Sequence, residues 1–536
     1  METDQTFVLH APDATSVVLV VDRDGAITRH EAGRRGATWI TSATAAHGDD
    51  YWYEVDGVGQ LLDPHAVDLR WTADGPCSVV RTSWPSQPSL GTRHADPVIY
   101  EVHVRGFART FAGVQQRLDH LADLGVNVLE LMPVHPFDAS DNYWGYMPLV
   151  WGAVHRPFAA DDALAPEELA ALVAAAHARD IEVWLDVVFN HTGEGDATLP
   201  TRCLRGIDDA HAYRHHPDGR YIDDSGCGND ANPADPEIRR LVIESLDRFA
   251  TLGIDGFRFD LASLLTRDDG GMVELITAWA QRRDVRLIAE PWDLAAYQVG
   301  SHLWPAEWMQ WNDRFRDDVR GFLRAEAGLV PAMIQRVQGS PDLFAPVGGA
   351  ASRSVNFVTA HDGLTMHDLT VVTSDRHRSW DCGPELRMQQ LQNYFTVLLL
   401  SSGSPMFVMG DEFARTQGGH DNPYNIDGEV TWVDWARLDE WRELYWFVRQ
   451  LLRLRREAFG ATVTCYGIDG APDTAFESRS LAWHGGDLYV MVNAWWEPLT
   501  FEVQVAGAWQ VVAASAPTDG RTLAPRSSVV LRRATA

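Results

Sequence analysis

Short apolar runs alternate with amphipathic stretches through the central part of the chain, from residue 98 to about residue 456. Leu118, Leu121 and Leu124 recur at the spacing of one helix face, and Gly125 stands where that helix is expected to end. The apolar runs predict strands at residues 98–104, 126–131, 181–189, 253–261, 285–289, 309–311, 355–358 and 406–409. Eight strands with helices between most of them predict an α/β fold, a (β/α)8 TIM barrel.

The pattern is different at both ends of the chain. Residues 6–58 hold short alternating runs separated by Gly and Asp turns, which predict a small N-terminal β-sandwich. Alternation returns from about residue 461, as at residues 488–492, and predicts a C-terminal β-sandwich. A Pro- and Ser-containing stretch at residues 84–89 indicates a linker, so the expected domains are residues 1–90, 91–458 and 459–536.

A long polar segment follows the third predicted strand. Residues 190–235 contain several glycines and show no clear periodicity, and loops of this length inside a compact domain are usually functional. Asp235, Pro236 and Glu237 then supply the N-cap, the first-turn proline and an acidic residue of a following helix. The barrel is therefore expected to carry a long insert.

Ionisable and aromatic side chains stand at the carboxyl ends of four predicted strands. They are Asp186 and His191 after the third strand, Arg258 and Asp260 on the fourth, Glu290 and Trp292 after the fifth, and His361 and Asp362 after the seventh. Catalysis in such barrels takes place at this face, so we expect these side chains to meet in one site. Structure alone gives no reason to gather so much charge in one place.

Two of these carboxyl groups have contrasting surroundings. Arg258 and Asp260 are two residues apart on one strand, so they point the same way, and the cation keeps Asp260 ionised as a nucleophile requires. Glu290 precedes Pro291 and Trp292, a more apolar setting in which a carboxyl group holds its proton. Such a pair suits glycoside hydrolysis with retention, in which one carboxylate attacks the anomeric carbon and the other protonates the leaving oxygen.

Residues 186–191 (DVVFNH), residues 256–260 (GFRFD), Glu290 and residues 361–362 (HD) together resemble the four characteristic segments of the α-amylase family, glycoside hydrolase family 13. The resemblance implies that Asp260 is the nucleophile, Glu290 the acid/base and Asp362 the transition-state stabiliser. The substrate-binding residues that it implies are Arg258, His191 and His361 around the glucose at the cleavage site, Asp186 in support, Tyr146 stacked under that glucose, and Trp292 beside the acid.

Further segments resemble isoamylase and the bacterial glycogen-debranching enzymes within this family: residues 98–107, 205–208, 223–229, 290–293 and 410–413. Residues 10–14 (HAPDA) resemble the glucan-binding module of family 48, which precedes the barrel in those enzymes. The resemblance implies a debranching enzyme that hydrolyses α-1,6 branch linkages of glycogen, amylopectin or related α-glucans. An α-1,4-acting amylase or 4-α-glucanotransferase would use the same three carboxylates and stays open. A catalytically inactive glucan-binding protein is disfavoured, because none of the three is missing.

Composition narrows the choice of partner. The chain has 45 Lys and Arg residues against 75 Asp and Glu residues, a formal net charge of −30. This field repels nucleic acid and anionic membranes, whereas a neutral glucan is indifferent to it. The 21 tryptophans suit stacking on sugar rings, although core packing also uses this residue.

No cofactor or metal is expected. The five cysteines are scattered without a Cys-x-x-Cys pair, which argues against a zinc site and a disulfide framework. Calcium occurs in the resembled family, but no acidic loop here has a clear ligand pattern. The acidic amino terminus lacks an apolar segment, and no apolar run is long enough to cross a membrane, so a cytoplasmic protein is expected.

Overall fold

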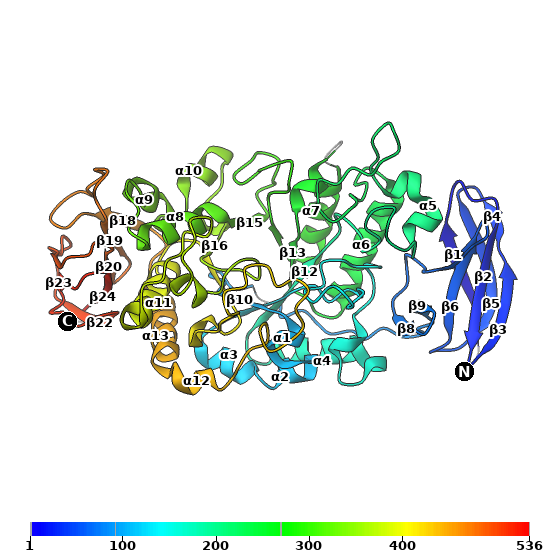
Figure 1. The fold of residues 1–536 in the computed structure, drawn as a ribbon, viewed down its shortest axis with the longest axis horizontal. Coiled ribbons are helices and arrows are strands. Elements are labelled where there is room, and N and C mark those ends of the chain that lie inside the picture. Colours follow the sequence, from blue (N-terminus) through cyan, green and yellow to red (C-terminus); the bar gives the residue numbers. More distant parts are fainter. Residues whose placement is uncertain (1–2, 92, 268–270, 535–536) are drawn as a thin grey trace.

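The computed structural model describes residues 3–91, 93–267 and 271–534. Figure 1 shows an elongated molecule in which β-sheets at the N-terminal end, a central barrel and β-sheets at the C-terminal end follow one another along the longest axis. This arrangement confirms the predicted fold class. The domain limits near residues 90 and 458 stay a prediction.

In the described part of the chain, eight parallel strands close the barrel in sequence order. They are β10 (Ile99–Val102), β11 (Val128–Leu131), β12 (Glu182–Val187), β13 (Gly256–Phe259), β14 (Arg286–Ala289), β15 (Trp308–Asn312), β16 (Ser354–Phe357) and β17 (Ser404–Val408). Pairing of β17 with β10, which places Met406 beside Ile99, closes the ring. A strand therefore stands at each of the eight predicted positions.

Gly256 is needed where it stands in the barrel wall. It lies beside Trp184 in the register of β12 and β13, and the Trp184 side chain is fully buried. A Cβ atom at Gly256 would lie 2.7 Å from Cδ1 of Trp184, so a larger residue would displace the indole ring. The glycine thus lets Trp184 pack inside the barrel beneath the strand ends.

Helices surround the barrel and connect its strands (Figure 1). The helices are α1 (Val104–Ala108), α2 (Phe111–Gln115), α3 (Leu118–Leu124), α4 (Ala165–His177), α5 (Leu204–Ala212), α6 (Pro236–Thr251), α7 (Gly271–Arg283), α8 (Asp313–Leu323), α9 (Val330–Val337), α10 (Pro341–Phe344), α11 (Pro384–Leu399), α12 (Arg437–Glu440) and α13 (Arg442–Ala458). Gly125 ends α3 with a φ of 103°, and the Asp235 side chain caps α6, as the sequence predicts.

The structure differs from the sequence-based expectation at two places. Val104, expected in the first barrel strand, begins α1, because the His103 side chain accepts a hydrogen bond from the Gly106 N–H at 3.0 Å and caps that helix. The insert at residues 190–235, expected as a loop, contains α5. This helix is interrupted at Asp208, whose φ is −154°, and the interruption explains why the sequence shows no regular period there.

The N-terminal part is a pair of antiparallel sheets. Its strands are β1 (Thr3–His10), β2 (Val17–Arg23), β3 (Ala26–Glu31), β4 (Gly33–Arg35), β5 (Thr38–Ala45), β6 (Asp50–Val55), β7 (Val58–Leu61), β8 (Leu69–Thr72) and β9 (Gly75–Val79). One sheet has the order β1-β5-β4 and the other β3-β2-β6-β9-β8, with β7 paired to β6. Leu9, Leu19, Trp39 and Tyr53 belong to the core that they share.

The C-terminal part is also antiparallel. Its strands are β18 (Val463–Tyr466), β19 (Ser480–Gly485), β20 (Leu488–Asn493), β21 (Leu499–Thr500), β22 (Trp509–Ala514), β23 (Thr522–Leu523) and β24 (Ser527–Arg533). The main sheet has the order β18-β19-β20-β24-β22, and β21 pairs with β23. Trp483 on β19 donates a hydrogen bond to the Leu400 carbonyl at 2.7 Å, which ties this part to the barrel.

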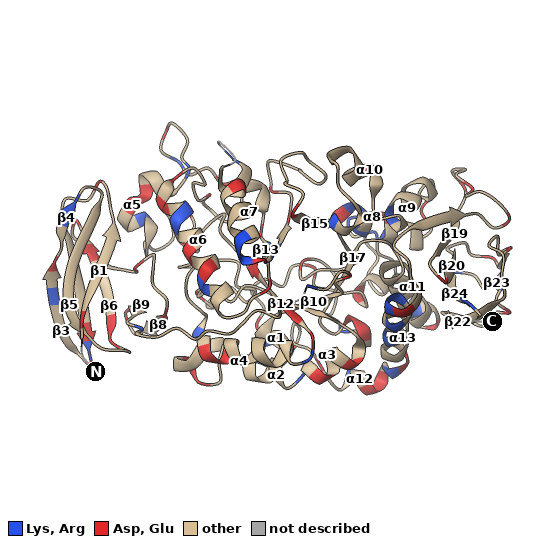
Figure 2. Ribbon diagram, turned by 180° about the vertical axis from the view of Figure 1, so that it is seen from behind, with Lys and Arg blue, Asp and Glu red and all other residues tan. Residues whose placement is uncertain are grey.

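Acidic residues are distributed over the whole molecule. Figure 2 shows them on N-terminal strands and on barrel helices alike, with basic and acidic residues together on α6 and α13. The net charge of −30 is therefore a property of the entire surface rather than of one patch. Among the described residues, no helix combines the length and the apolar composition that a membrane span needs.

His65 joins the N-terminal sheets to α6. Its Nε2 lies 2.7 Å from a carboxylate oxygen of Glu237, and its Nδ1 lies 2.7 Å from one of Glu244. Burial alone would lower the pKa of His65, but these hydrogen bonds outweigh it and raise the pKa to about 9. Both ring nitrogens donate only in the imidazolium form, so the cation makes this connection.

Substitution His65→Ala is expected to lower the melting temperature more at pH 6 than at pH 10. The pKa of His65 is raised from 6.5 to about 9 in the folded protein, so its stabilisation is complete below pH 6.5 and is lost as the pH rises through about 9. Thermal unfolding of both proteins at both pH values measures the difference. His216→Ala, at an exposed histidine of the insert, is the matched control. An equal loss at both pH values would show that His65 stabilises by packing alone.

Candidate active site

The strand ends bring the predicted residues to one face of the barrel. Asp186 on β12 and Arg258 on β13 are direct neighbours in the parallel register. Asp260 and Glu290 each come directly after the last paired positions of the neighbouring strands β13 and β14. Their carboxyl groups therefore leave adjacent strands at similar heights.

Arg258 is the centre of this site. Its side chain is 1% exposed, and its Nη1 lies 2.7 Å from Asp186 Oδ2 and 3.3 Å from Asp260 Oδ1. Its Nη2 lies 2.9 Å from Glu290 Oε2. The ring of Trp311 on β15 supports the guanidinium, whose carbon lies 4.1 Å from the ring centre. One buried cation thus holds three carboxyl groups in place.

Glu290 is largely buried and lies against Arg258, a contact that its apolar neighbours in the sequence do not indicate. Its Oε2 accepts a hydrogen bond from the Leu261 backbone N–H at 2.8 Å and forms an ion pair with Nη2 of Arg258 at 2.9 Å. Burial nevertheless raises the pKa of Glu290 to about 7, although Arg258 opposes the rise, while Asp260 adds to it. Because Oε2 faces both the Leu261 N–H and the Arg258 guanidinium, Oε1 is the oxygen left to carry a proton and to protonate a leaving group.

Asp260 is held from both sides. Its Oδ1 faces Arg258, and its Oδ2 accepts a hydrogen bond from Asn190 Nδ2 at 3.0 Å. The next residue, Leu261, has a φ of 37°, a left-handed conformation that is unusual for leucine. This turn directs the Leu261 N–H to Glu290, so the backbone after the aspartate also positions the second carboxyl group.

His191 lies near Asp260, the candidate nucleophile, and its side chain is a cation. Its Nε2 lies 2.6 Å from the Tyr146 carbonyl oxygen, and its Nδ1 contacts Asn190 Oδ1. Both partners are acceptors, so both ring nitrogens donate. Burial would lower the pKa of His191, but Cys227, Asp260 and the Tyr146 carbonyl outweigh it and raise the pKa to about 9.

His361 and Tyr146 form the adjoining wall. Their rings stack with centroids 4.8 Å apart and an interplanar angle of 26°. His361 Nδ1 lies 2.7 Å from Glu101 Oε1, and its backbone N–H donates to Oε2 of the same carboxylate. Burial would lower the pKa of His361, but Glu101 raises it overall. The Tyr146 hydroxyl donates to Asp186, where burial raises the carboxyl pKa to about 6 against the effect of Arg258.

Asp362 and Trp292 stand at the rim. Asp362 is exposed, and its side chain makes no hydrogen bond or ion pair with the described residues. Trp292 is half-buried, and its ring lies nearly parallel to that of Tyr297, with centroids 6.5 Å apart. The structure thus groups Asp186, Asp260 and Glu290 around one cation and leaves Asp362 outside that group.

Three residues outside the predicted set complete the site. Asn190 bridges Asp260 and His191, Glu101 holds His361, and Trp311 supports Arg258. Glu101 had a signal in the sequence, because a carboxylate inside an apolar strand needs a buried partner. Trp311 had no such signal in the sequence, because an aromatic residue on a barrel strand looks the same as an ordinary core residue.

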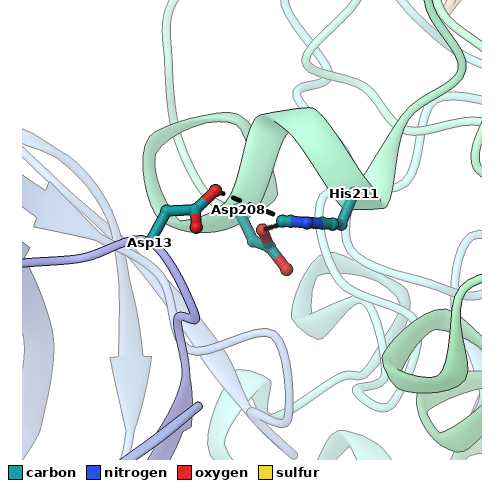
Figure 3. A group of neighbouring side chains, drawn as sticks. All are labelled: Asp13, Asp208 and His211. Carbon is teal, nitrogen blue, oxygen red and sulfur yellow. Dashed lines mark hydrogen bonds and ion pairs between the residues drawn. The ribbon is translucent and has the colours of Figure 1, made fainter.

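A group with metal-ligand spacing lies elsewhere, between the N-terminal sheets and α5 (Figure 3). Asp13 comes from the N-terminal part, and Asp208 and His211 come from α5. His211 Nδ1 lies 2.6 Å from Asp208 Oδ1, so this nitrogen is already engaged. Calcium takes six to eight oxygen ligands, and this group does not fit it.

The geometry defines the chemistry that the site can perform. Asp260 and a Glu290 whose pKa is about 7 share one guanidinium at the mouth of the barrel. This is the combination of nucleophile and proton donor that a retaining glycosidase needs. The surrounding hydrogen-bond groups and stacked rings suit a polyhydroxylated ring.

Comparisons with known proteins identify the family of the chain. The α-amylase catalytic-domain model matches residues 102–201. The chain is 34% identical to chloroplast isoamylase SU1 of Zea mays, over 84% of this chain and 70% of that protein. It is 36% identical to the glycogen operon protein GlgX homologue of Haemophilus influenzae, over 84% of this chain and 82% of that protein. The chain belongs to the isoamylase and glycogen-debranching group of the α-amylase family.

This membership makes the protein a glycoside hydrolase. The chain aligns with 64% of the length of the Mycobacterium tuberculosis glycogen operon protein GlgX homologue, at 36% identity. Among solved structures, the pullulanase of Anoxybacillus sp. LM18-11 in complex with maltotetraose has a TM-score of 0.84 at 24% identity, covering 99% of this chain and 87% of that one. At this level of identity the likeness establishes the fold.

Proposed function

We propose that this enzyme hydrolyses α-1,6 branch linkages of glycogen, amylopectin or related α-glucans with retention of configuration. The observation that carries the proposal is the pair Asp260 and Glu290 on adjacent strand ends, bound to the two terminal nitrogens of Arg258. Relatives named isoamylase and glycogen debranching enzyme, the latter from Salmonella paratyphi B at 33% identity, support the linkage.

Each side chain has a definite part in the proposed reaction. Asp260 attacks the anomeric carbon while Glu290 donates its proton from Oε1 to the oxygen of the leaving glucan chain. Glu290 then removes a proton from water, which displaces Asp260 from the sugar. Arg258 and Asn190 hold Asp260 in position through hydrogen bonds to its two carboxylate oxygens. No external cofactor takes part in these steps.

The substrate-binding residues surround the glucose that reacts. Tyr146 supplies a ring for stacking, His191 and His361 supply N–H donors to sugar hydroxyls, and Asp186 holds Arg258 and Tyr146 in position. Asp362 at the exposed rim approaches the sugar only when substrate occupies the mouth, where it stabilises the cationic transition state. Trp292 provides an apolar face on the other side of Glu290.

Cleavage of α-1,4 linkages, or glucan transfer, is the alternative chemistry of the same carboxylates. The names of the relatives favour debranching. The cytoplasmic location stays a prediction.

The linkage is tested by product analysis. The enzyme is expected to release linear maltooligosaccharides from amylopectin and short stubs from β-limit dextrin, and to leave linear amylose intact. Chromatography identifies the chains, and proton NMR at early times identifies the anomer, which is expected to be α. Shortening of amylose without release of branches would establish the α-1,4 alternative.

A further inference from the structure

A cavity of about 610 Å³ lies where the N-terminal sheets meet the barrel. Trp71 on β8 lines one side, and Phe137, Ser140 and Asp161 of the barrel line another. This volume is within the range of small-molecule sites, which is about 300–1,000 Å³. None of these residues belongs to the catalytic site described above.

A second cavity, of about 200 Å³, adjoins the first. It shares Asp138 and Ser140 with the first cavity and is lined further along by Asn142, Met147 and Gly193. Met147 is the residue after Tyr146, and Gly193 is two residues after His191. The two cavities together, here called the interdomain groove, thus extend from Trp71 to the segments that carry two substrate-binding residues.

Trp71 is held in position without being buried. Its ring meets His155 edge to face, with centroids 6.3 Å apart, and His155 stacks on Phe137 at 4.1 Å with an interplanar angle of 12°. Trp71 remains 38% exposed. A tryptophan fixed by its neighbours and open to a cavity can stack on a sugar ring with little loss of side-chain entropy.

The charges around the groove disfavour an anionic occupant. Arg70 and Arg156 line the larger cavity, but Arg70 lies 2.6 Å from Asp50, and Arg156 lies 2.7 Å from Asp68. The remaining charged groups are Asp138, Asp161 and Asp162 in the larger cavity, and Asp138, Asp141 and Arg202 in the smaller. An anionic ligand would be repelled, whereas sugar hydroxyls can donate to these carboxylates.

We propose that the interdomain groove binds the outer part of the branch chain that the enzyme cleaves off, with Trp71 stacking on one of its glucose rings. The smaller cavity is lined by Met147 and Gly193, which are close in sequence to Tyr146 and His191. In the proposed reaction the glucose that Tyr146 and His191 bind belongs to the branch chain. This inference rests on the proposed function and extends it: the N-terminal sheets contribute to the choice of branch length.

Trp71→Ala is therefore expected to lower kcat/KM on amylopectin, whose branches are long, by about three- to tenfold, the loss of one stacking contact. On β-limit dextrin, whose outer branches are trimmed to short stubs, kcat/KM is expected to stay at the wild-type value. Trp71→Phe keeps an aromatic ring and is expected to retain most of the wild-type kcat/KM on amylopectin. Trp496→Ala, at a 51% exposed tryptophan of the C-terminal part, is the matched control. It is expected to leave kcat/KM on both substrates unchanged.

The possible outcomes separate this inference from the proposed function. Equal loss on both substrates, or no loss on amylopectin, in folded Trp71→Ala protein would overturn the role of the groove. If that variant does not fold, Trp71→Gln and Trp71→Phe are measured in its place. The quantity compared is the ratio of kcat/KM on amylopectin to kcat/KM on β-limit dextrin. Absence of branch release from both substrates by the wild-type enzyme would instead refute the proposed function.

Discussion

Asp260→Asn is expected to abolish hydrolysis of branched glucans, with a loss on the order of 10⁴-fold or more in kcat. The amide is nearly isosteric and still reaches Asn190 and Arg258, but it is not a nucleophile, so no glycosyl-enzyme can form. Binding of maltooligosaccharides, measured by calorimetry, and the melting temperature are expected to stay close to the wild-type values.

Two further measurements make this test specific. A 2-fluoro glycosyl fluoride is expected to label wild-type enzyme on the peptide that contains Asp260 and to leave Asp260→Asn unlabelled. Asp375→Asn, the same change at a 92% exposed side chain, is the control for the substitution itself and is expected to be fully active. Retention of a tenth of the wild-type rate by Asp260→Asn would rule out its role as nucleophile.

Glu290→Gln is expected to slow amylopectin hydrolysis by about 10²- to 10⁴-fold, because the leaving oxygen of a glucan needs a proton. α-Maltotriosyl fluoride needs none, so its first step is expected to stay fast and to appear as a burst of fluoride equal to the enzyme concentration. The second step also lacks its base, so turnover is expected to resume when azide, a nucleophile that needs no base, replaces water.

The pH dependence provides an independent check on Glu290. Catalysis requires its protonated form, whose pKa burial raises to about 7, so kcat/KM is expected to fall as the pH rises above about 7. In Glu290→Gln this upper limb is expected to disappear, since the amide does not titrate. Equal slowing of glucan and fluoride, without a burst, would contradict the assignment of Glu290 as the acid.

The sequence by itself determined the barrel and which strand ends carry the central charged residues of the site. Alternation of apolar runs with amphipathic helices follows from the local geometry of strands and helices, so eight strand positions could be read directly. The residues at the strand ends could be read as well, because parallel strands present their carboxyl ends at one face. Asp186, Arg258, Asp260 and Glu290 do meet there.

Contacts between residues distant in sequence needed the tertiary structure. Sequence spacing places Arg258 near Asp260, yet it says nothing of the distance to Glu290, which depends on the register between β13 and β14. The raised pKa of Glu290 consequently comes from burial in the closed barrel and not from a separation from the cation. Asn190 and Glu101 acquire their roles in the same way, through contacts with Asp260 and His361, which follow other strands of the barrel.

The interdomain groove is the clearest case of what only the tertiary structure decided. Trp71 is one of 21 tryptophans, and nothing around it in the sequence marks it. Its position over a cavity results from packing of β8 against the barrel segment that holds Phe137 and His155. Local patterns specify strands and helices because they depend on neighbours along the chain, whereas a groove between two folded parts depends on how their surfaces fit together.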